Sequence, residues 1–264
     1  KVAGAWSTGG AMNSPRAYLA GCGIQTAAVG FGGSEPPKTG KTEEYDGSSW
    51  TESGDLSTDR YKNGGAGTQT AAISVAGRNG TNQDETETYN GASWTEVGDV
   101  NTGRYGLRTV GTSTAALSFG GTPPIVGVTE LWNGTAWTEV GDLGTARYNP
   151  GYLGTTTDAI AFGGQIPAQT SNVEDWNGTS WTETTNIPAV RQGSNCFGTT
   201  TLGIGGGGYV TPAAVSADTL FYDGTTWTEL ANLSTARFGS AAGGTSELGV
   251  IGGGYHRTVA TEEW

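Results

Sequence analysis

Hydrophobic and polar positions recur along this chain with a period of about 44 residues. Each repeat carries a short motif in which an aromatic residue stands five positions before a tryptophan, as in "WNGTSWTE" at residues 176 to 183. The tryptophan slot is filled by Trp6, Trp50, Trp94, Trp137, Trp181 and Trp227. The first aromatic slot is filled by Tyr45, Tyr89, Trp132, Trp176, Tyr222 and Trp264. A period of this length predicts a repeat architecture in which each repeat is one supersecondary unit.

The pattern within one repeat predicts four short strands. In the fourth repeat, residues 147–155 are glycine-rich, 157–164 are apolar, 171–176 alternate in character and 179–184 follow the motif turn. The Asn-Gly pair at 177–178 predicts a two-residue type I′ hairpin turn. No segment keeps a helical period over three turns. Four strands in each of six repeats predict an all-β, six-bladed β-propeller with four antiparallel strands per blade, which occupies residues 1–264 as a single domain.

Two charged slots accompany the aromatic ones. An arginine follows each slot tryptophan by ten residues, and these arginines are Arg16, Arg60, Arg104, Arg147, Arg191 and Arg237. A glutamate stands two residues before the first aromatic in most repeats, at Glu43, Glu87, Glu130, Glu174 and Glu262. Leu220 replaces it in the fifth repeat. Because the two slots have similar multiplicity, we expect a ring of partly buried Arg–Glu pairs with one arginine left unpaired.

The repeat resembles a known family. A double glycine such as Gly163-Gly164, an acidic residue, an aromatic, a tight turn, a tryptophan and then an arginine recur over essentially the whole chain, and this order resembles the kelch repeat. The second repeat has Ala76-Gly77 in place of the double glycine, and the fifth lacks the acidic residue. The resemblance implies a kelch-type propeller like the central domain of galactose oxidase. The "NGTSWTE" wording is also similar to repeat proteins of marine phages, which implies a structural or fibre module on a virion or an extracellular appendage.

The two ends of the sequence predict how the ring closes. Lys1 stands five residues before Trp6, and Trp264 occupies the same first aromatic slot at the other end. We therefore expect the termini to share one blade, with the outer strand from residues 2–8 and the third strand from 259–264. Such a closure removes the exposed strand edge.

Charge and composition narrow the classes of partner and chemistry. Acidic residues outnumber basic ones by 25 to 13, and an acidic surface repels phosphate backbones and anionic lipid, so we expect neither nucleic acid nor a membrane surface as partner. Cys22 and Cys196 are predicted to be free buried thiols. The chain has one histidine, His256, so the copper chemistry of galactose oxidase is not carried over. We expect no enzymatic activity, no cofactor and no metal site.

Two groups of residues are candidates for ligand binding. The loops that follow the double glycines diverge between repeats, and Tyr209, Tyr255, His256 and Arg257 add aromatic and polar side chains there. Ordinary divergence of loops is the alternative. The residue after the slot arginine is aromatic in four repeats, at Tyr61, Tyr105, Tyr148 and Phe238. These rings can surround the channel mouth and stack on a sugar, or they can pack between blades.

A third pattern is acidic. Asp55, Asp99 and Asp142 recur in the loop before the slot arginine and suggest either a ring of calcium sites or local turn chemistry. Taken together, the sequence predicts a non-enzymatic binding or structural module that recognises a glycan or a protein surface. The alternatives are a lectin with a repeated sugar site in each blade, and a scaffold without ligand, including a designed or consensus-like repeat protein.

Overall fold

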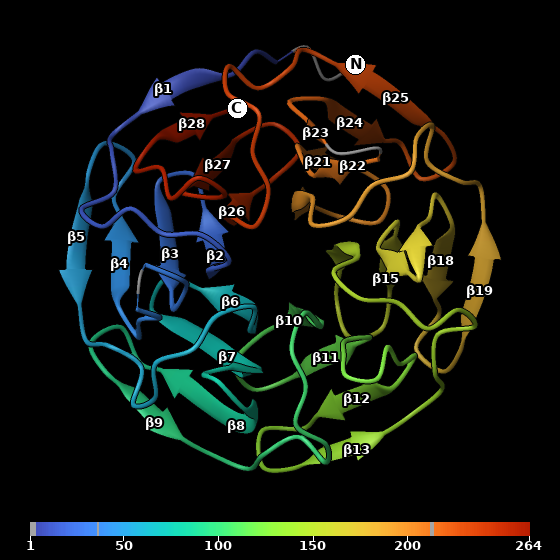
Figure 1. Ribbon diagram of the computed structural model, residues 1–264, viewed down its shortest axis with the longest axis horizontal. Coiled ribbons are helices and arrows are strands. Elements are labelled where there is room, and N and C mark those ends of the chain that lie inside the picture. Colours follow the sequence, from blue (N-terminus) through green and yellow to red (C-terminus); the bar gives the residue numbers. More distant parts are fainter. Residues whose placement is uncertain (1–3, 36, 212–213) are drawn as a thin grey trace.

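A computed structural model describes residues 4–35, 37–211 and 214–264. Six four-stranded antiparallel sheets stand around a central axis as the blades of a propeller (Figure 1). In each blade the first strand lies next to the axis and the fourth lies at the rim, as β2 and β5 show. The predicted all-β, six-bladed propeller is therefore confirmed. No helix capable of crossing a membrane occurs in the described part of the chain.

We number the blades I to VI from the sheet that begins at β2. Blades I to III consist of β2 (Ala20–Ile24), β3 (Ala27–Phe31), β4 (Thr42–Tyr45) and β5 (Trp50–Ser53); β6 (Gly64–Thr68), β7 (Ala71–Arg78), β8 (Asn82–Tyr89) and β9 (Trp94–Glu96); β10 (Arg108–Gly111), β11 (Ala116–Phe119), β12 (Thr129–Trp132) and β13 (Trp137–Glu139). Blades IV to VI consist of β14 (Gly151–Gly154), β15 (Ala159–Phe162), β18 (Val173–Trp176) and β19 (Trp181–Thr184); β20 (Asn195–Gly198), β21 (Gly203–Gly206), β24 (Thr219–Tyr222) and β25 (Trp227–Leu230); β26 (Ala241–Gly244), β27 (Gly249–Gly252), β28 (Thr261–Glu263) and β1 (Ser7–Gly9). Two small hairpins extend the loops of blades IV and V: β16 (Gln165–Ile166) with β17 (Ala168–Gln169), and β22 (Tyr209–Val210) with β23 (Ala214–Val215).

Blade VI is built from both ends of the chain. Its outer strand β1 pairs with β28, so that Ser7 lies opposite Glu263 and Gly9 opposite Thr261. Trp6 packs on Trp264 with the ring centroids 5.3 Å apart, as the paired aromatics do in the other blades. The predicted closure by both termini is confirmed, and β1 covers the strand edge that β28 would otherwise expose. The position expected for Lys1 lies outside the described residues.

The turn between the third and fourth strands differs from the prediction. In blade IV, Trp176 and Trp181 are register partners, so the turn contains four residues rather than two. Gly178 has a φ of +94°, whereas Asn177 is not among the residues with positive φ. A type I′ turn needs positive φ at both central residues, so that prediction is wrong. The Asn177 side chain instead accepts the backbone N–H groups of Thr179 and Ser180, both at 3.0 Å.

The slot arginines form the predicted ion pairs, and these are fully buried. Arg16 Nη2 lies 2.7 Å from Glu43 Oε1, and neither side chain is exposed. The equivalent pairs are Arg60–Glu87, Arg104–Glu130, Arg147–Glu174 and Arg237–Glu262. Each glutamate belongs to the third strand of the blade that its arginine precedes. It also accepts a backbone N–H from the residue three positions before that arginine, as Glu262 does from Ser234 at 2.7 Å.

Blade V lacks this arrangement in two coupled ways. Leu220 fills the glutamate slot and is fully buried, so Arg191 has only the more exposed Asp218, with Nη2 to Oδ2 at 3.6 Å. No described residue accepts a hydrogen bond from Nε or Nη2 of Arg191. Three residues earlier stands Pro188, which has no N–H to donate. The carboxylate and the loop donor that it would satisfy are thus both missing from the same blade.

The slot tryptophans connect neighbouring blades. Trp227 packs on Tyr222 of its own blade at 4.6 Å and on Phe162 of the preceding blade at 4.7 Å between centroids. The indole N–H donates to a threonine hydroxyl of the preceding blade in five cases. The threonines of this slot are Thr42, Thr86, Thr129, Thr219 and Thr261. Val173 fills the slot in blade IV, and Trp227 Nε1 has no acceptor among the described residues.

The recurrent loop acids serve the same threonine slot. Asp55 accepts the backbone N–H of Thr42 at 3.0 Å, and Asp99 and Asp142 do the same for the next two slot threonines. Within the described ranges, no group of three or more His, Cys, Asp or Glu side chains is placed to hold a metal ion. Cys22 and Cys196 are free and buried, as predicted.

Candidate functional site

A closed ring of backbone hydrogen bonds surrounds the channel on the face that carries the divergent loops, here called the loop face. The residue two positions after each slot arginine donates its N–H to the carbonyl of the equivalent residue in the preceding blade. The six N···O distances run from 2.6 to 3.4 Å. The members of this mouth ring are Tyr18, Lys62, Gly106, Asn149, Gly193 and Gly239. Because every member is bonded to both neighbours, the ring fixes the backbone around the channel.

The mouth ring has an unusual backbone conformation for its side chains. All six members have φ between +52° and +67°, in the left-handed region where glycine is the default residue. Asn149 is tolerated there, whereas a tyrosine or lysine costs about 1–2 kcal/mol. Such strain clusters at functional sites, so its position at Tyr18 and Lys62 is a reason to look for a ligand here.

Two loop residues beside the mouth ring have the same conformation. His256 and Arg257 have φ of +70° and +53°. Five of the six described non-glycine residues with positive φ lie in or beside the mouth ring. The sixth, Ala76, stands in place of the first residue of a double glycine. Left-handed side chains are therefore concentrated around one end of the channel.

The side chains above the mouth ring line a depression of about 260 Å³, here called the mouth. Five blades contribute to its wall, and the lining residues are Tyr18, Lys62, Tyr148, Asn149, Gln165, Gln192, Tyr209, Phe238 and Tyr255. Blade III contributes none of them, because its ring member is Gly106 and the Tyr148 ring occupies the space that a Cβ there would need. The glycines of the ring thus make room for the aromatic side chain of the next blade.

Aromatic rings form one wall of the mouth. Phe238 lies between Tyr255, stacked on it at 4.6 Å, and Tyr209 at 5.5 Å, both between centroids. Tyr18 packs edge-on against Phe238 at 5.6 Å. Tyr255 is 37% exposed, so this wall is open to solvent. Exposed aromatic faces in a concave site are typical of ligand-binding surfaces.

Lys62 forms the centre of the other wall. Its Nζ lies 4.6 Å from the ring centroid of Tyr18 and 5.1 Å from that of Tyr148, and it donates a hydrogen bond to Tyr148 Oη. Burial, with Arg108 and Arg78 nearby, lowers the pKa of the Lys62 ammonium to about 8. Burial raises the pKa of the Tyr148 hydroxyl, which stays neutral. The wall is therefore a cation framed by aromatic rings.

Amide side chains complete the mouth. Asn149 is 5% exposed, and Gln165 and Gln192 are half-buried beside it. The buried Oε1 of Gln192 has no hydrogen-bond donor among the described residues. Amides offer both donors and acceptors, so the mouth has polar side chains next to aromatic ones.

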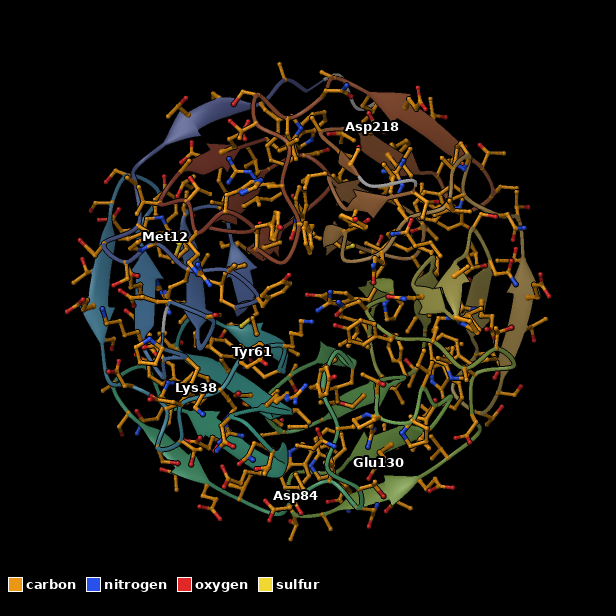
Figure 2. All side chains as sticks on the ribbon, in the orientation of Figure 1. Met12, Lys38, Tyr61, Asp84, Glu130 and Asp218 are labelled. Carbon is orange, nitrogen blue, oxygen red and sulfur yellow. The ribbon has the colours of Figure 1, made fainter. Side chains whose placement is uncertain are left out.

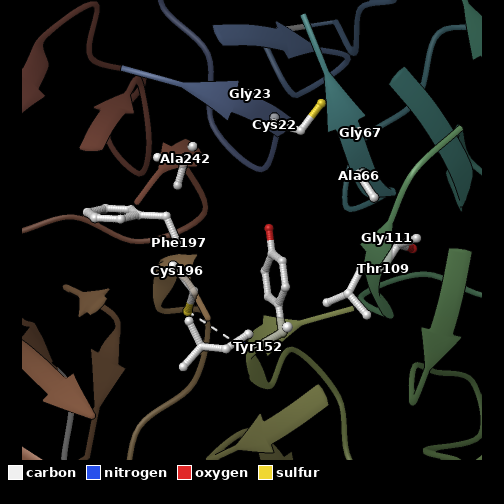
Figure 3. A pocket seen from close by; sticks show the side chains of 18 residues that line it. Cys22, Gly23, Ala66, Gly67, Thr109, Gly111, Tyr152, Cys196, Phe197 and Ala242 are labelled. Carbon is white, nitrogen blue, oxygen red and sulfur yellow. Dashed lines mark hydrogen bonds between the residues drawn. The ribbon is translucent and has the colours of Figure 1, made fainter. Parts of the chain in front are cut away.

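The opposite end of the channel is different in kind (Figure 3). The first strands of all six blades line a space of about 130 Å³ there, mostly with glycine and other small residues. The Tyr152 phenol points into this space, and burial raises its pKa to about 12. Cys196 Sγ accepts the backbone N–H of Tyr152 at 3.4 Å. Burial also raises the pKa of both cysteine thiols to about 12, so they stay protonated at neutral pH.

The candidate residues from the sequence come together only in part. Tyr148, Tyr209 and Tyr255 line the same mouth, although they were chosen from two separate patterns. Tyr61 and Tyr105 lie just outside the lining (Figure 2 labels Tyr61), and each packs on a neighbouring ring, Tyr18 at 6.4 Å and Tyr148 at 5.9 Å.

The other two loop candidates also lie outside the lining. His256 contacts the Tyr255 ring at 4.3 Å, and Arg257 is exposed.

Sequence reasoning missed the residues nearest the channel axis. Tyr18, Lys62 and Asn149 belong to a position that reads Tyr, Lys, Gly, Asn, Gly and Gly in the six repeats. The excess of glycine and asparagine at one position is a signal for a left-handed backbone. The two residues that break this rule, Tyr18 and Lys62, both line the mouth.

Comparisons with known proteins identify no family for this chain. No protein-family profile matches the sequence. No curated protein matches it significantly.

Proposed function

We propose that this propeller is a non-enzymatic carbohydrate-binding module and that its binding site is the mouth on the loop face. The observation that carries the proposal is the convergence of Tyr209, Phe238 and Tyr255 with the polar groups of Asn149 and Gln192 around one depression. A sugar ring has apolar C–H faces that pack on aromatic rings, and hydroxyl groups that bond to amides. The mouth offers both kinds of partner, with the partly exposed Tyr255 ring on one side and amide side chains beside it.

The size of the mouth favours binding of a single sugar unit, and its chemistry favours binding without catalysis. Pockets for drug-sized ligands measure about 300–1,000 Å³, and the mouth at about 260 Å³ is somewhat smaller. It suits a single residue of a longer glycan. The described lining includes no aspartate or glutamate, whereas glycoside hydrolysis uses a pair of carboxylic acids. The proposal is therefore recognition without catalysis.

The biological context that we propose is based on the sequence of the repeat. The slots of this chain resemble kelch repeats, and the "NGTSWTE" motif is similar to that of phage structural proteins. A glycan-binding propeller on a virion or an extracellular appendage would contact bacterial surface polysaccharide. A protein surface as partner is the second candidate, and the divergent loops around the mouth favour it, because loops on a rigid scaffold adapt readily to a protein.

A glycan array that includes bacterial polysaccharides tests the proposal. The informative variant is Tyr209→Ala with Tyr255→Ala, since Tyr255 is partly exposed and truncation there leaves the blade cores intact. Tyr152→Phe, at the other end of the channel, is the matched control. We expect binding that the double variant loses and the control keeps. Binding that survives in the double variant contradicts a site at the mouth, and the absence of any glycan binding contradicts the carbohydrate function.

A further inference from the structure

We propose that the mouth selects a sugar that carries an acidic group, a carboxylate or a sulfate, and that Lys62 contacts that group. This inference deepens the carbohydrate-binding function proposed above and rests on it.

Lys62 is a cation without a counter-ion. The ion pairs of the described residues involve only the slot arginines and Lys41, so none of them includes Lys62. Its ammonium contacts three tyrosine rings, Tyr18, Tyr105 and Tyr148, and donates to a neutral hydroxyl. Cation–π contacts compensate only part of the loss of hydration. A half-buried charge with so few polar partners is commonly paired.

Two further cations, Arg78 and Arg108, lie near Lys62. The guanidinium of Arg78 lies 5.1 Å from the Tyr105 centroid and donates to Tyr105 Oη at 3.2 Å. Arg108 reaches into the channel below the mouth ring, where it donates to the carbonyl of Pro150 at 2.9 Å. Neither makes an ion pair within the described part of the chain. Three unpaired cations thus lie together in a protein whose net charge is −12.

An anion in the mouth would resolve this arrangement. It would restore the charge balance of Lys62, and the positive potential around the channel would attract it from solution despite the acidic surface elsewhere. The described lining contributes no acid that would repel it. The neighbouring aromatic wall then holds the sugar ring that carries the charge.

The protonation state of Lys62 gives a second, independent readout. The free protein has the Lys62 pKa lowered to about 8, because burial disfavours the ammonium. A bound anion favours the ammonium and raises that pKa. Affinity for an acidic sugar should therefore be constant below about pH 7 and fall as the pH rises through 8, with proton uptake on binding near pH 8.

The test uses paired glycans and three variants of the full chain. The probes are uronic-acid oligosaccharides with their carboxyl-reduced forms, and sulfated oligosaccharides with their desulfated forms. Lys62→Asn removes the charge with a residue that tolerates positive φ, Lys62→Arg keeps the charge, and Lys38→Asn removes a different cation from the loop face. We expect wild type to prefer the acidic member of a pair by about tenfold or more, and Lys62→Asn alone to lose the preference.

The outcomes separate this inference from the function on which it rests. Retention of the preference by Lys62→Arg and Lys38→Asn supports the inference, and the pair that responds identifies carboxylate or sulfate. Equal binding of acidic and neutral members, or an unchanged preference in Lys62→Asn, overturns the inference and leaves carbohydrate binding in place. If no glycan binds at all, both are overturned.

Discussion

The contacts that join neighbouring blades keep the same residues from repeat to repeat, whereas the side chains at the mouth of the channel vary. The frame, by which we mean the arginine, glutamate, threonine and tryptophan slots, has the same residue in all blades or in all but one. The mouth ring also has one backbone conformation six times, yet its side chains range from glycine to lysine. Repetition therefore marks what holds the ring together. Departure from repetition, where the backbone does not change, marks the mouth that we propose as the ligand site.

Blade V shows a departure from the frame in which two partners change together. Leu220 removes the carboxylate and Pro188 removes the loop N–H that the carboxylate would accept. Arg191 keeps only a distant acid. In the mouth ring, by contrast, the side chain differs from blade to blade while the backbone conformation stays the same. The following variants test this distinction, from the largest expected effect to the smallest.

The largest effect is expected when the blade V residue is placed in an intact blade. Glu174→Leu leaves the buried Arg147 without its carboxylate, and the N–H groups of Gly144 and Thr145 without their acceptor. We expect a loss of about 3–5 kcal/mol in the free energy of unfolding, measured by denaturant titration. Glu139→Leu, on the exposed outer strand, is the control and should change stability by less than about 0.5 kcal/mol. Similar losses in the two variants would contradict a structural role for the buried pair.

The reverse change should restore the missing pair only as a double substitution. Leu220→Glu returns a carboxylate to Arg191, and Pro188→Ser returns the loop N–H that it accepts in the other blades. In a double-mutant cycle we expect a favourable coupling of roughly 1–3 kcal/mol between positions 188 and 220. Stabilities that simply add would mean that the two departures are unrelated.

A mouth residue should show the opposite relation between stability and function. Lys62→Gly relieves a left-handed side chain and removes an unpaired half-buried charge. We expect stability to rise by about 1 kcal/mol while binding of an acidic sugar is lost. Thermal unfolding and glycan binding, measured on the same preparation, check both halves. A clear fall in stability would place Lys62 in the frame instead.

The smallest effect is expected at the incomplete threonine slot. Val173→Thr supplies the acceptor that Trp227 Nε1 lacks. Thr129→Val removes the hydroxyl that accepts the Trp181 indole N–H at 3.0 Å in the wild-type protein. We expect changes of opposite sign, on the order of 0.5–1 kcal/mol each, in the free energy of unfolding. Two changes of the same sign would show that packing of the valine, not the hydrogen bond, decides this slot.

The frame could be predicted from the sequence because it repeats. The spacing of Trp and Arg slots indicated the blades, the pairing of Arg16 with Glu43 and its equivalents, and the shared blade of the termini, and all of these are confirmed. The missing glutamate at Leu220 also pointed to the arginine with the weakest partner. Within the frame, the prediction of a two-residue turn was wrong, because an Asn-Gly pair fits two different turn geometries.

The mouth could be predicted only in part, because several of its residues do not repeat. Tyr255 was visible as an aromatic departure and Tyr148 as a recurring aromatic after a slot arginine, but nothing in the sequence places them at one depression. That requires the curvature of the ring, which brings Tyr209 and Phe238 together from different blades. Lys62 was missed because no other repeat has a lysine at its position. The residues that it contacts, Tyr18 and Tyr148, lie 44 and 86 residues away in the sequence.

The stoichiometry of glycan binding tests the central claim most directly. Isothermal titration calorimetry with the glycan that binds most tightly on the array gives the number of sites per chain. A single site at the mouth, where the repeats depart from one another, predicts one glycan per propeller. A value near six would mean that sugar binds to the repeated part of each blade, and would contradict the claim that the departures make the site.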